Sequence, residues 1–515
     1  MIKPHKLPIG IQDFKKLIEG DYVYIDKTKY IHQIINSGSV FFLSRPRRFG
    51  KSLTISTMKY LFEGEKDLFK NTYIYNHWDF DIKYPVIHLS MSELDTKNTD
   101  LFHQSLIFRL NNYYDKFKLD KIKIDSTKVL LQDLVYKLSK INKVVVLIDE
   151  YDKPLLDHLF DKDLTEFREY LRNFYGVLKD LDPYLKFVFL TGISKFSKIG
   201  IFSTLNNLND ISNDNKYSQF LGYTEEEIKL HFNQYLDKIF QDKNITKKQL
   251  LEDIKDWYDG YSFNGLSFVY NPFSLLNFFS KGEFNNFWFE SGSPSFLVNY
   301  VKNKGISIND IKDISVPKNF TSISEIEVTS IQSFLYQAGY LTISSQDEIG
   351  YFLNFPNKEV RTAFSQLMLI ANYSLDDIKQ NNIIREMIKG LKENNFDLVI
   401  KALNIAFANI PSNLFTNKES FYHSVILSIF YTAGFNVIAE ESTSLGNSDL
   451  VLEYNKSIYV IELKTTSINK AISQIKDKKY YQKYLIKHKP LYAVGMLIDL
   501  KKRNIAKVGI VSVKA

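Results

Sequence analysis

The chain has 515 residues, which is too long for one ordinary hydrophobic core, so roughly two to four domains are expected. Its hydrophobic fraction of 44% and charged fraction of 24% are typical of a folded soluble protein and exclude a disordered one. The net charge of +7 is compatible with a polyanionic partner without requiring one, and the absence of cysteine excludes disulfides and thiolate zinc sites.

The first residues, MIKPHKLPIG, lack the apolar core of a secretory signal. No run of about eighteen apolar residues occurs, so we expect no membrane span. A cytoplasmic location fits these features and the lack of cysteine.

The segment FFLSRPRRFGKSL, residues 41–53, is the most informative part of the chain. An apolar strand runs into a loop that ends in Gly50-Lys51-Ser52, and a helix follows. In this context, backbone N–H groups at the helix start and the Lys51 ammonium bind nucleotide phosphates, while the Ser52 hydroxyl reaches Mg²⁺. The usual loop opens with Gly where this chain has Arg45, so the motif needs support from elsewhere.

Strand and helix patterns alternate over the first 222 residues, which we expect to form the first domain. This alternation predicts an α/β fold with a mostly parallel sheet covered by helices. The strands are expected at 40–43, 86–90, 144–148 and 187–190, and the helices at 51–62, 99–115, 126–140 and 163–179.

The third strand, within KVVVLIDEYDKPL, ends in Asp149-Glu150. Beside a phosphate loop, the first carboxylate would hold Mg²⁺ through water and the second would orient or deprotonate the attacking water. Acids that merely cap a strand are also common, and the pairing with Gly-Lys-Ser favours the nucleotide interpretation. At the end of the fourth strand, Thr191 and Ser194 either sense the γ-phosphate or form an ordinary Ser/Thr strand end.

The arginines of the loop leave three interpretations open: they contact phosphates in their own subunit, act on a neighbouring subunit of a homo-oligomer, or are solvated charges. The residues that we expect to bind the nucleotide are Arg45, Arg48, Gly50, Lys51, Ser52, Leu53, Asp149 and Thr191.

From about residue 224 the chain becomes mainly helical, and TEEEI marks an acidic helix start. The helix pattern IQSFLYQAG is followed by strand GYLTI, a turn at 344–350 and strand YFLNF, which resembles a winged-helix module. We therefore expect a second domain at 223–372, with a helical lid and a winged-helix-like region. A helical connector at 373–415 would open the third domain, 373–515.

The last hundred residues contain a second acidic group. Patterns predict a helix at 419–433, strands at 435–440, 448–454 and 457–463, a helix at 468–486 and a strand at 491–498. Asp449 lies thirteen residues before Glu462, and adjacent antiparallel strands would bring both carboxylates to one Mg²⁺ or Mn²⁺ ion. Lys464 shares a strand face with Glu462 and would hold water or neutralise charge, and Gln474 lies on the next helix.

Taken singly, these side chains are normally solvated, and Glu419 and His423 on the preceding helix form either part of the site or a weak surface pair. The order and spacing of the whole set favour a metal-dependent nuclease core. The Lys/Tyr-rich run 476–488 either follows a nucleic-acid backbone and stacks bases or is a solvated amphipathic helix.

With these motifs in view, the chain resembles a bacterial family that pairs an AAA-ATPase-like domain with a C-terminal PD-(D/E)XK nuclease domain. The similarity extends over nearly the whole length and rests on LPIGIQDFKKLI, YIDKTKYI, SRPRRFGKSL, VVVLIDEYDKPL, FLTGISKFSKIGIFSTLNNLNDIS, WYDGYSF, YNPFSLL, FLYQAGYLTI, FPNKEVR, ESFYHSVILSIFYTAGF, GNSDLVLEY, VIELKT and QIKDKKYYQKY. The resemblance implies a P-loop NTPase sheet of the ASCE/AAA-like class and a C-terminal α/β restriction-endonuclease-like fold. It also implies ATP and Mg²⁺ as cofactors and DNA or RNA as partner.

The resemblance makes RPRRFGKS the family's own phosphate loop, so Arg45 is not a defect. Two positions depart from the family: Asn447 stands where an arginine usually precedes the catalytic aspartate, and Lys195 stands where arginine is common. The residues that match family motifs are Lys51, Ser52, Asp149, Glu150, Asp449, Glu462, Lys464 and Gln474.

The sequence thus predicts a Mg²⁺-dependent nuclease that is regulated by ATP binding or hydrolysis. The expected catalytic residues are Glu150, Asp449, Glu462, Lys464 and Gln474, and the expected metal ligands are Ser52, Asp149, Asp449 and Glu462. The alternative is a nucleotide-switched nucleic-acid-binding or scaffold protein with an inactive nuclease fold, which Asn447 favours.

Overall fold

The computed structural model describes residues 5–159, 161–195, 207–243, 245–290, 301–302, 306–311, 314–321, 330–443 and 446–513. The chain forms two compact units, which are described separately. Unit 1 comprises Met1–Phe287 and Asp313–Asn357, and unit 2 comprises Trp288–Lys312 and Lys358–Ala515. The three-domain division at 222 and 372 stays a prediction.

Unit 1 is built on a five-stranded parallel sheet, as the alternating pattern predicted. The strands are β1 (Val40–Ser44), β2 (Val86–Ser90), β3 (Val144–Asp149), β4 (Leu185–Gly192) and β5 (Asn209–Asp210). They lie in the order β2-β3-β4-β1-β5, so β4 separates β1 from β3, the arrangement of an ASCE/AAA-like sheet. The two-residue strand β5 was not predicted, because so short a segment carries no periodic pattern.

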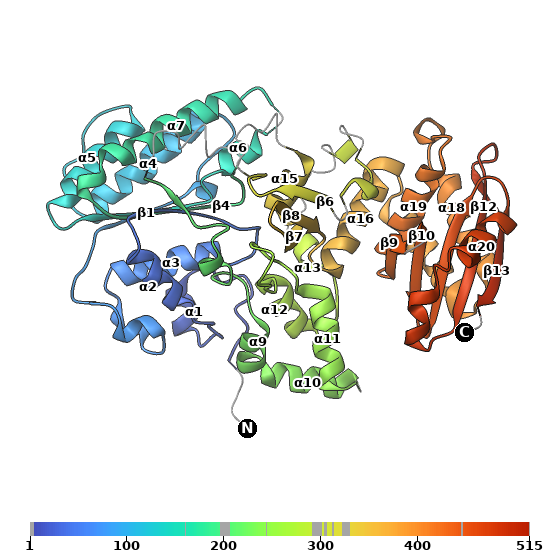
Figure 1. Cartoon of the computed structure of the whole chain (residues 1–515). Helices are drawn as coiled ribbons and strands as arrows, with labels where there is room; N and C mark the ends of the chain where they lie inside the picture. Colours follow the sequence, from blue (N-terminus) through green and yellow to red (C-terminus); the bar gives the residue numbers. More distant parts are fainter. Residues whose placement is uncertain are drawn as a thin grey trace. The chain divides into compact units, whose positions relative to one another are not determined.

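Helices cover both faces of this sheet. In Figure 1, α4, α5 and α7 lie together over one face, whereas α1, α2 and α3 lie on the other. Strands β1 and β3 are buried along their whole length, which explains their unbroken apolar sequences. The helices are α1 (Phe14–Glu19), α2 (Thr28–Ile35), α3 (Lys51–Phe62), α4 (Thr99–Lys116), α5 (Thr127–Ser139), α6 (Lys153–Asp157) and α7 (Leu164–Asp180).

A helical group follows the sheet, and the TEEEI helix start is confirmed by a capping box between Thr224 and Glu227. Val23 and Ile25 of the N-terminal segment belong to the apolar core of this group. Its helices are α9 (Glu225–His231), α10 (Asn233–Lys243), α11 (Lys247–Tyr258) and α12 (Pro272–Lys281), and α13 (Phe287–Glu290) lies at the boundary between the units.

The predicted helix and two strands of the middle region are present as α15 (Ile331–Ala338), β7 (Thr342–Gln346) and β8 (Gly350–Asn354). A third strand, β6 (Ile314–Pro317), pairs with β8 and gives an antiparallel sheet of order β6-β8-β7. This strand was not predicted, because only four residues form it.

Unit 2 contains a mixed five-stranded sheet of order β13-β12-β11-β10-β9. Neighbouring strands are antiparallel except β11 and β12, which are parallel because helix α20 connects them. The elements are α16 (Lys358–Tyr373), α17 (Asp377–Lys392), α18 (Phe396–Asn409), α19 (Glu419–Thr432), β9 (Asn436–Thr443), β10 (Gly446–Tyr454), β11 (Ser457–Lys464), α20 (Ile468–Asp477), β12 (Leu491–Asp499) and β13 (Asn504–Val513).

The predicted helix at 468–486 is wrong in its second half. Helix α20 ends at Asp477, and a short 3-10 helix follows at Gln482–Lys487. The chain leaves the helix because Lys479 adopts a left-handed conformation with φ of 48°, which its residue type does not announce. The last strand, β13, was not predicted either.

Within the described part of the chain, no helix combines the length and apolar character that crossing a bilayer requires, in agreement with the sequence.

Candidate functional site

The carboxyl ends of parallel strands meet at one edge of the unit 1 sheet, and the predicted nucleotide residues gather there. The phosphate loop, residues 45–50, follows β1, and Gly50 precedes α3 with φ of 91°, a conformation that favours glycine. Ser52 and Leu53 are half-buried in the first turn of α3, so their backbone N–H groups lie at the helix start.

The Lys51 ammonium lies inside the phosphate loop. Its Nζ donates to the carbonyl oxygens of Arg45 at 2.8 Å and Pro46 at 2.9 Å. Burial lowers the pKa of Lys51 to about 8, although Asp149 and Glu150 favour the charged form. Among the described residues, the hydrogen bonds of this buried cation go to neutral carbonyls, so it is suited to exchange them for a phosphate.

Arg45 does not face the mouth of the loop as the sequence led us to expect. Its guanidinium is 1% exposed, donates to the carbonyl oxygens of Ser44, Ser212 and Tyr217, and stacks at 3.8 Å on the Phe263 ring. Through these contacts the Arg45 side chain stabilises the phosphate loop from its buried side. All of these contacts are to the protein itself, so a phosphate contact is not needed to explain the position of the side chain.

Arg48, in contrast, is exposed and lies 4.7 Å from the ring of Phe273 at the start of α12. Its backbone φ is 68°, so a non-glycine residue occupies a left-handed position in the phosphate loop. Arg48 is therefore the better placed of the two predicted arginines for a ligand at the loop surface.

Asp149 and Thr191 lie on adjacent strands and contact each other directly. Asp149 is buried at the end of β3, and the Thr191 hydroxyl donates to its Oδ1. In the register of the sheet Thr191 pairs with Leu43 of β1, so it lies between the phosphate-loop strand and Asp149. Glu150 follows in a left-handed conformation, with φ of 54°, and is partly exposed.

Beyond β4, Lys195 is buried rather than presented to solvent. Its Nζ lies 3.2 Å from Asp210 and 2.9 Å from Asn213, while its backbone N–H donates to the side-chain oxygen of Gln337 on α15. This position therefore links the end of β4 to β5 and α15.

The second acidic group gathers on β10 and β11 of unit 2. The Asp449 Oδ2 accepts from the Leu463 N–H at 2.7 Å, and the Asp449 N–H donates to Glu462 Oε2 at 3.4 Å. Glu462 is 1% exposed, and burial together with the Asp449 charge raises its pKa to about 7. Two neighbouring carboxylates that repel each other in this way form a donor set suited to a divalent cation.

Lys464 lies between the acidic side chains, as its spacing from Glu462 predicted. Its Nζ is 2.9 Å from Glu462 Oε1 and 3.9 Å from Glu419 on α19. Burial opposes the charge, but Glu462, Asp449 and Glu419 outweigh it and raise the pKa of Lys464, so the ammonium stays protonated.

Gln474 and His423 complete the set from two flanking helices. The Gln474 amide donates to Glu462 Oε1 and, at 3.3 Å, to the Tyr480 hydroxyl. His423 is buried, and its Nε2 lies 3.0 Å from the backbone oxygen of Asp449, so it is not a surface residue. The structure thus brings together Asp449, Glu462, Lys464, Gln474, Glu419 and His423.

The Lys/Tyr-rich run 476–488 differs from the prediction. Tyr480 and Tyr484 are buried in an apolar cluster with Ile475 and Val451, so these two rings are not available to stack on bases. The hypothesis of base stacking along this run is therefore wrong for both tyrosines, although the lysines of the run are exposed.

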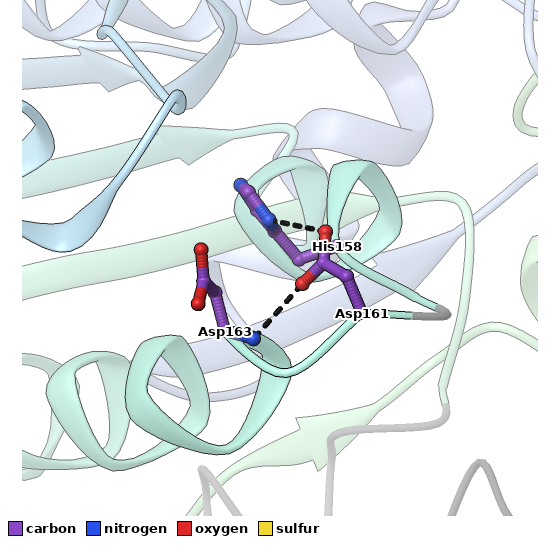
Figure 2. A group of neighbouring side chains, drawn as sticks. All are labelled: His158, Asp161 and Asp163. Carbon is purple, nitrogen blue, oxygen red and sulfur yellow. Dashed lines mark hydrogen bonds and ion pairs between the residues drawn. The ribbon is translucent and has the colours of Figure 1, made fainter.

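A third cluster, not predicted from the sequence, comprises His158, Asp161 and Asp163 between α6 and α7 (Figure 2). Their ligand atoms lie within 4.8 Å of one another. However, His158 Nδ1 is 2.8 Å from Asp161 and Nε2 is 2.5 Å from the Thr96 oxygen, so both ring nitrogens are engaged. Burial opposes the charged ring, yet these two acceptors raise the pKa of His158. Because both ring nitrogens already have partners, the histidine links Asp161 to Thr96 and is not arranged as a metal ligand.

Sequence reasoning also missed Asp152, whose buried carboxylate accepts hydrogen bonds from Ile193 and Ser194. The available signal was the third acid in DEYD, two residues after Glu150.

Comparisons with known proteins match two stretches of the chain, one in each unit. The profile of the family described as "Predicted AAA-ATPase" matches residues 8–202, and that of the PD-(D/E)XK nuclease superfamily matches residues 417–508. A protein of Azotobacter chroococcum mcd 1, described as "Uncharacterized protein in vnfD 5'region", is 34% identical over 525 residues, which cover 97% of this chain and 98% of that protein.

Among solved structures, the Aeropyrum pernix ORC1 protein in complex with DNA covers 68% of this chain and 96% of its own, with 8% identity and a TM-score of 0.27. At that level of similarity it says nothing of this chain's function. The full-length match and the two profiles do establish the relationship: the chain belongs to the family of proteins in which a predicted AAA-ATPase domain is followed by a PD-(D/E)XK nuclease superfamily domain.

Proposed function

We propose that this protein is a metal-dependent nuclease whose activity is controlled by ATP. The observation that carries the proposal is the convergence of Asp449, Glu462, Lys464 and Gln474 from two strands and a helix. A structural role alone does not explain two repelling carboxylates beside a lysine, one of them almost fully buried.

In the nuclease site, Asp449 and Glu462 would hold Mg²⁺ or Mn²⁺, which when bound polarises the phosphodiester and lowers the pKa of water. Lys464 carries a protonated ammonium next to Glu462, so it would orient water or neutralise charge that develops on the phosphate. The Gln474 amide donates to Glu462 and thereby fixes the rotamer of that carboxylate.

In the nucleotide site, Lys51 and the N–H groups at the start of α3, near Ser52 and Leu53, would bind the phosphates of ATP. Asp149 would hold Mg²⁺ together with the Ser52 hydroxyl, and Glu150 would accept a proton from the attacking water. The Thr191 hydroxyl donates to Asp149, and this contact supports a response of Thr191 to the γ-phosphate. Arg48 would contact the ligand from the loop surface.

The test is a nuclease assay of the full chain over single- and double-stranded DNA and RNA, with and without ATP and with Mg²⁺ or Mn²⁺. We expect metal-dependent cleavage that Asp449→Ala abolishes and that ATP changes. If wild type and Asp449→Ala leave every substrate intact under all these conditions, the nuclease proposal fails.

A second candidate function is a nucleotide-switched nucleic-acid-binding or scaffold protein with an inactive nuclease fold. The observation that favours it is Asn447, an exposed amide on β10 two residues before Asp449, at the position where the family motif that the chain resembles has arginine. Calorimetry separates the two candidates, because an inactive site of this kind would take up neither Mg²⁺ nor Mn²⁺.

A further inference from the structure

Asp152 is a buried carboxylate whose role differs from that of its neighbours. It occupies the N-cap position of α6 and yet makes no capping hydrogen bond to that helix, which is the usual use of an aspartate there. The side chain is 1% exposed. Among the described residues, all the hydrogen bonds that it accepts from other residues come from the segment after β4.

Three groups donate to this carboxylate. The backbone N–H of Ser194 lies 2.7 Å from Asp152 Oδ2, the Ser194 hydroxyl lies 2.7 Å from the same atom, and the Ile193 N–H lies 3.1 Å away. Burial raises the pKa of Asp152, while the Ser194 bonds and the nearby Lys51 charge act in the opposite direction. A carboxylate is costly to bury, so its presence at this position calls for a role beyond packing.

Gly192 permits this close approach. A Cβ atom at position 192 would lie 2.5 Å from the Tyr151 ring and 2.8 Å from Asp152 Oδ1. The segment 149–152 therefore packs directly on the end of β4, and any side chain at Gly192 would separate the two.

The segment that Asp152 holds contacts the nucleotide site at three points. The Thr191 hydroxyl donates to Asp149, and the Thr191 carbonyl accepts from the Tyr151 N–H at 2.9 Å. The Gly192 carbonyl accepts from the Arg45 N–H of the phosphate loop at 3.2 Å. A shift of residues 191–194 would thus move the partner of Asp149 and one anchor of the phosphate loop together.

We propose that Asp152 is a positioning residue for ATP hydrolysis, which fixes the end of β4 so that Thr191 and Asp149 keep their relative geometry. This inference rests on the proposed function, because it concerns turnover at the same nucleotide site. Asp152 touches no phosphate in this role; it acts through Ile193 and Ser194. Small displacements of positioned groups have large effects on turnover and small effects on ground-state binding.

The experiment compares Asp152→Asn with wild type and with Asp180→Asn, a control at an exposed acid on the end of α7. Steady-state ATP hydrolysis gives kcat, and titration with a fluorescent, non-hydrolysable ATP analogue gives Kd. We expect kcat to fall at least about tenfold in Asp152→Asn while Kd stays within about threefold, since the asparagine keeps the volume but lacks the charge and, with an NH2 group in place of Oδ1, loses the second acceptor of the Ile193 N–H at 3.3 Å. The control should match wild type in both quantities.

A loss confined to kcat supports the positioning role. Unchanged kcat, or a parallel loss of kcat and analogue binding, overturns it. If the wild-type chain does not hydrolyse ATP, the ATPase proposal and the positioning role are both refuted. If wild type hydrolyses ATP and Asp152→Asn retains that turnover, only the positioning role is refuted. If Asp152→Asn does not fold, Ser194→Ala decides the matter: a several-fold drop in kcat at unchanged Kd supports the proposal, and unchanged kcat rejects it.

Discussion

The guanidinium of Arg45 stabilises the phosphate loop from the inside. It donates to Ser44 and to two carbonyl oxygens of the segment after β5, and its planar group stacks on Phe263. Burial lowers its pKa to about 10, although Tyr336 and Asp210 favour the charged form, so the side chain stays charged at neutral pH. Lysine cannot reproduce this fork of donors or the stacking.

We therefore expect Arg45→Lys to destabilise the protein by about 2–3 kcal/mol, because charged hydrogen bonds to buried carbonyls are lost. Arg48→Lys is the matched control in the same loop. Because Arg48 is exposed, this substitution should lower the free energy of unfolding by less than about 0.5 kcal/mol. Urea unfolding of the full chain measures both. If Arg45→Lys keeps wild-type stability and loses only ATP affinity, Arg45 is a phosphate ligand after all.

The pKa of Glu462 makes the nuclease site sensitive to pH. Its value in the folded protein, about 7, exceeds the ordinary value of 4.5, so the metal-free folded state binds a proton that the unfolded state releases in this window. Stability should therefore fall as pH rises from 4.5 to about 7. Mn²⁺ needs the ionised carboxylate, so its affinity should rise by up to about tenfold per pH unit over the same window.

Thermal unfolding of the metal-free protein across this range, followed by Mn²⁺ titration at each pH, tests both trends. Glu462→Gln cannot ionise and should flatten the two curves. A wild-type affinity for Mn²⁺ that does not change with pH would show that Glu462 is already ionised without metal.

At the scale of elements, helix α20 is seated on its sheet by two glycines that face each other across β12 and β13. Gly495 pairs with Gly509, and α20 contacts β11, β12 and β13. A Cβ at Gly495 would lie 3.0 Å from the Ala471 Cβ and 3.1 Å from the Ile468 backbone oxygen. This close packing sets the position of Gln474 on the same helix.

Gly495→Ala should therefore push α20 away from the sheet, destabilise unit 2 by about 1–3 kcal/mol and lower nuclease turnover through Gln474. Ser473→Ala, an exposed position on α20, is the control and should leave stability and turnover unchanged. Unfolding midpoints and cleavage rates measure the two effects. Wild-type values for Gly495→Ala would mean that the helix adjusts without displacing Gln474.

Most elements could be predicted from the sequence. Strands β1 and β3 stand out as unbroken apolar runs, and the hairpin of β10 and β11 was predicted as two strands. The motif residues also met the predicted partners, because strand order and the alternation of side chains place Asp449 beside Glu462 and Asp149 beside the phosphate loop. The inward direction of Arg45 and the hydrogen bonds that Asp152 accepts from Ser194 could not be predicted, because they depend on which distant segments bury these side chains. The end of α20 was missed because a lysine adopts a left-handed conformation there.

At the scale of the whole molecule, the nucleotide site and the nuclease site lie in different units, so control of one by the other needs a connecting element. Lys195, directly after the segment held by Asp152, donates its backbone N–H to Gln337 of α15. Strands β7 and β8 follow α15, and β8 ends at Asn354. Helix α16 of unit 2 begins at Lys358, so three residues, 355–357, connect β8 to the second unit along the chain.

Gln337→Ala should accordingly weaken the effect of ATP on the nuclease while ATP hydrolysis and nuclease activity without ATP both persist. The reason is that Gln337 is buried and accepts a hydrogen bond from the Lys195 N–H, just after β4. It belongs neither to the proposed nucleotide site nor to the proposed nuclease site. The ratio of cleavage rates with and without ATP is the measurement, and we expect it to move at least about threefold toward one. Gln332→Ala on the same helix is the control and should keep the wild-type ratio, since Gln332 makes no side-chain hydrogen bond to another described residue. An unchanged ratio in Gln337→Ala would exclude α15 as the connecting element and leave any coupling to other segments of unit 1.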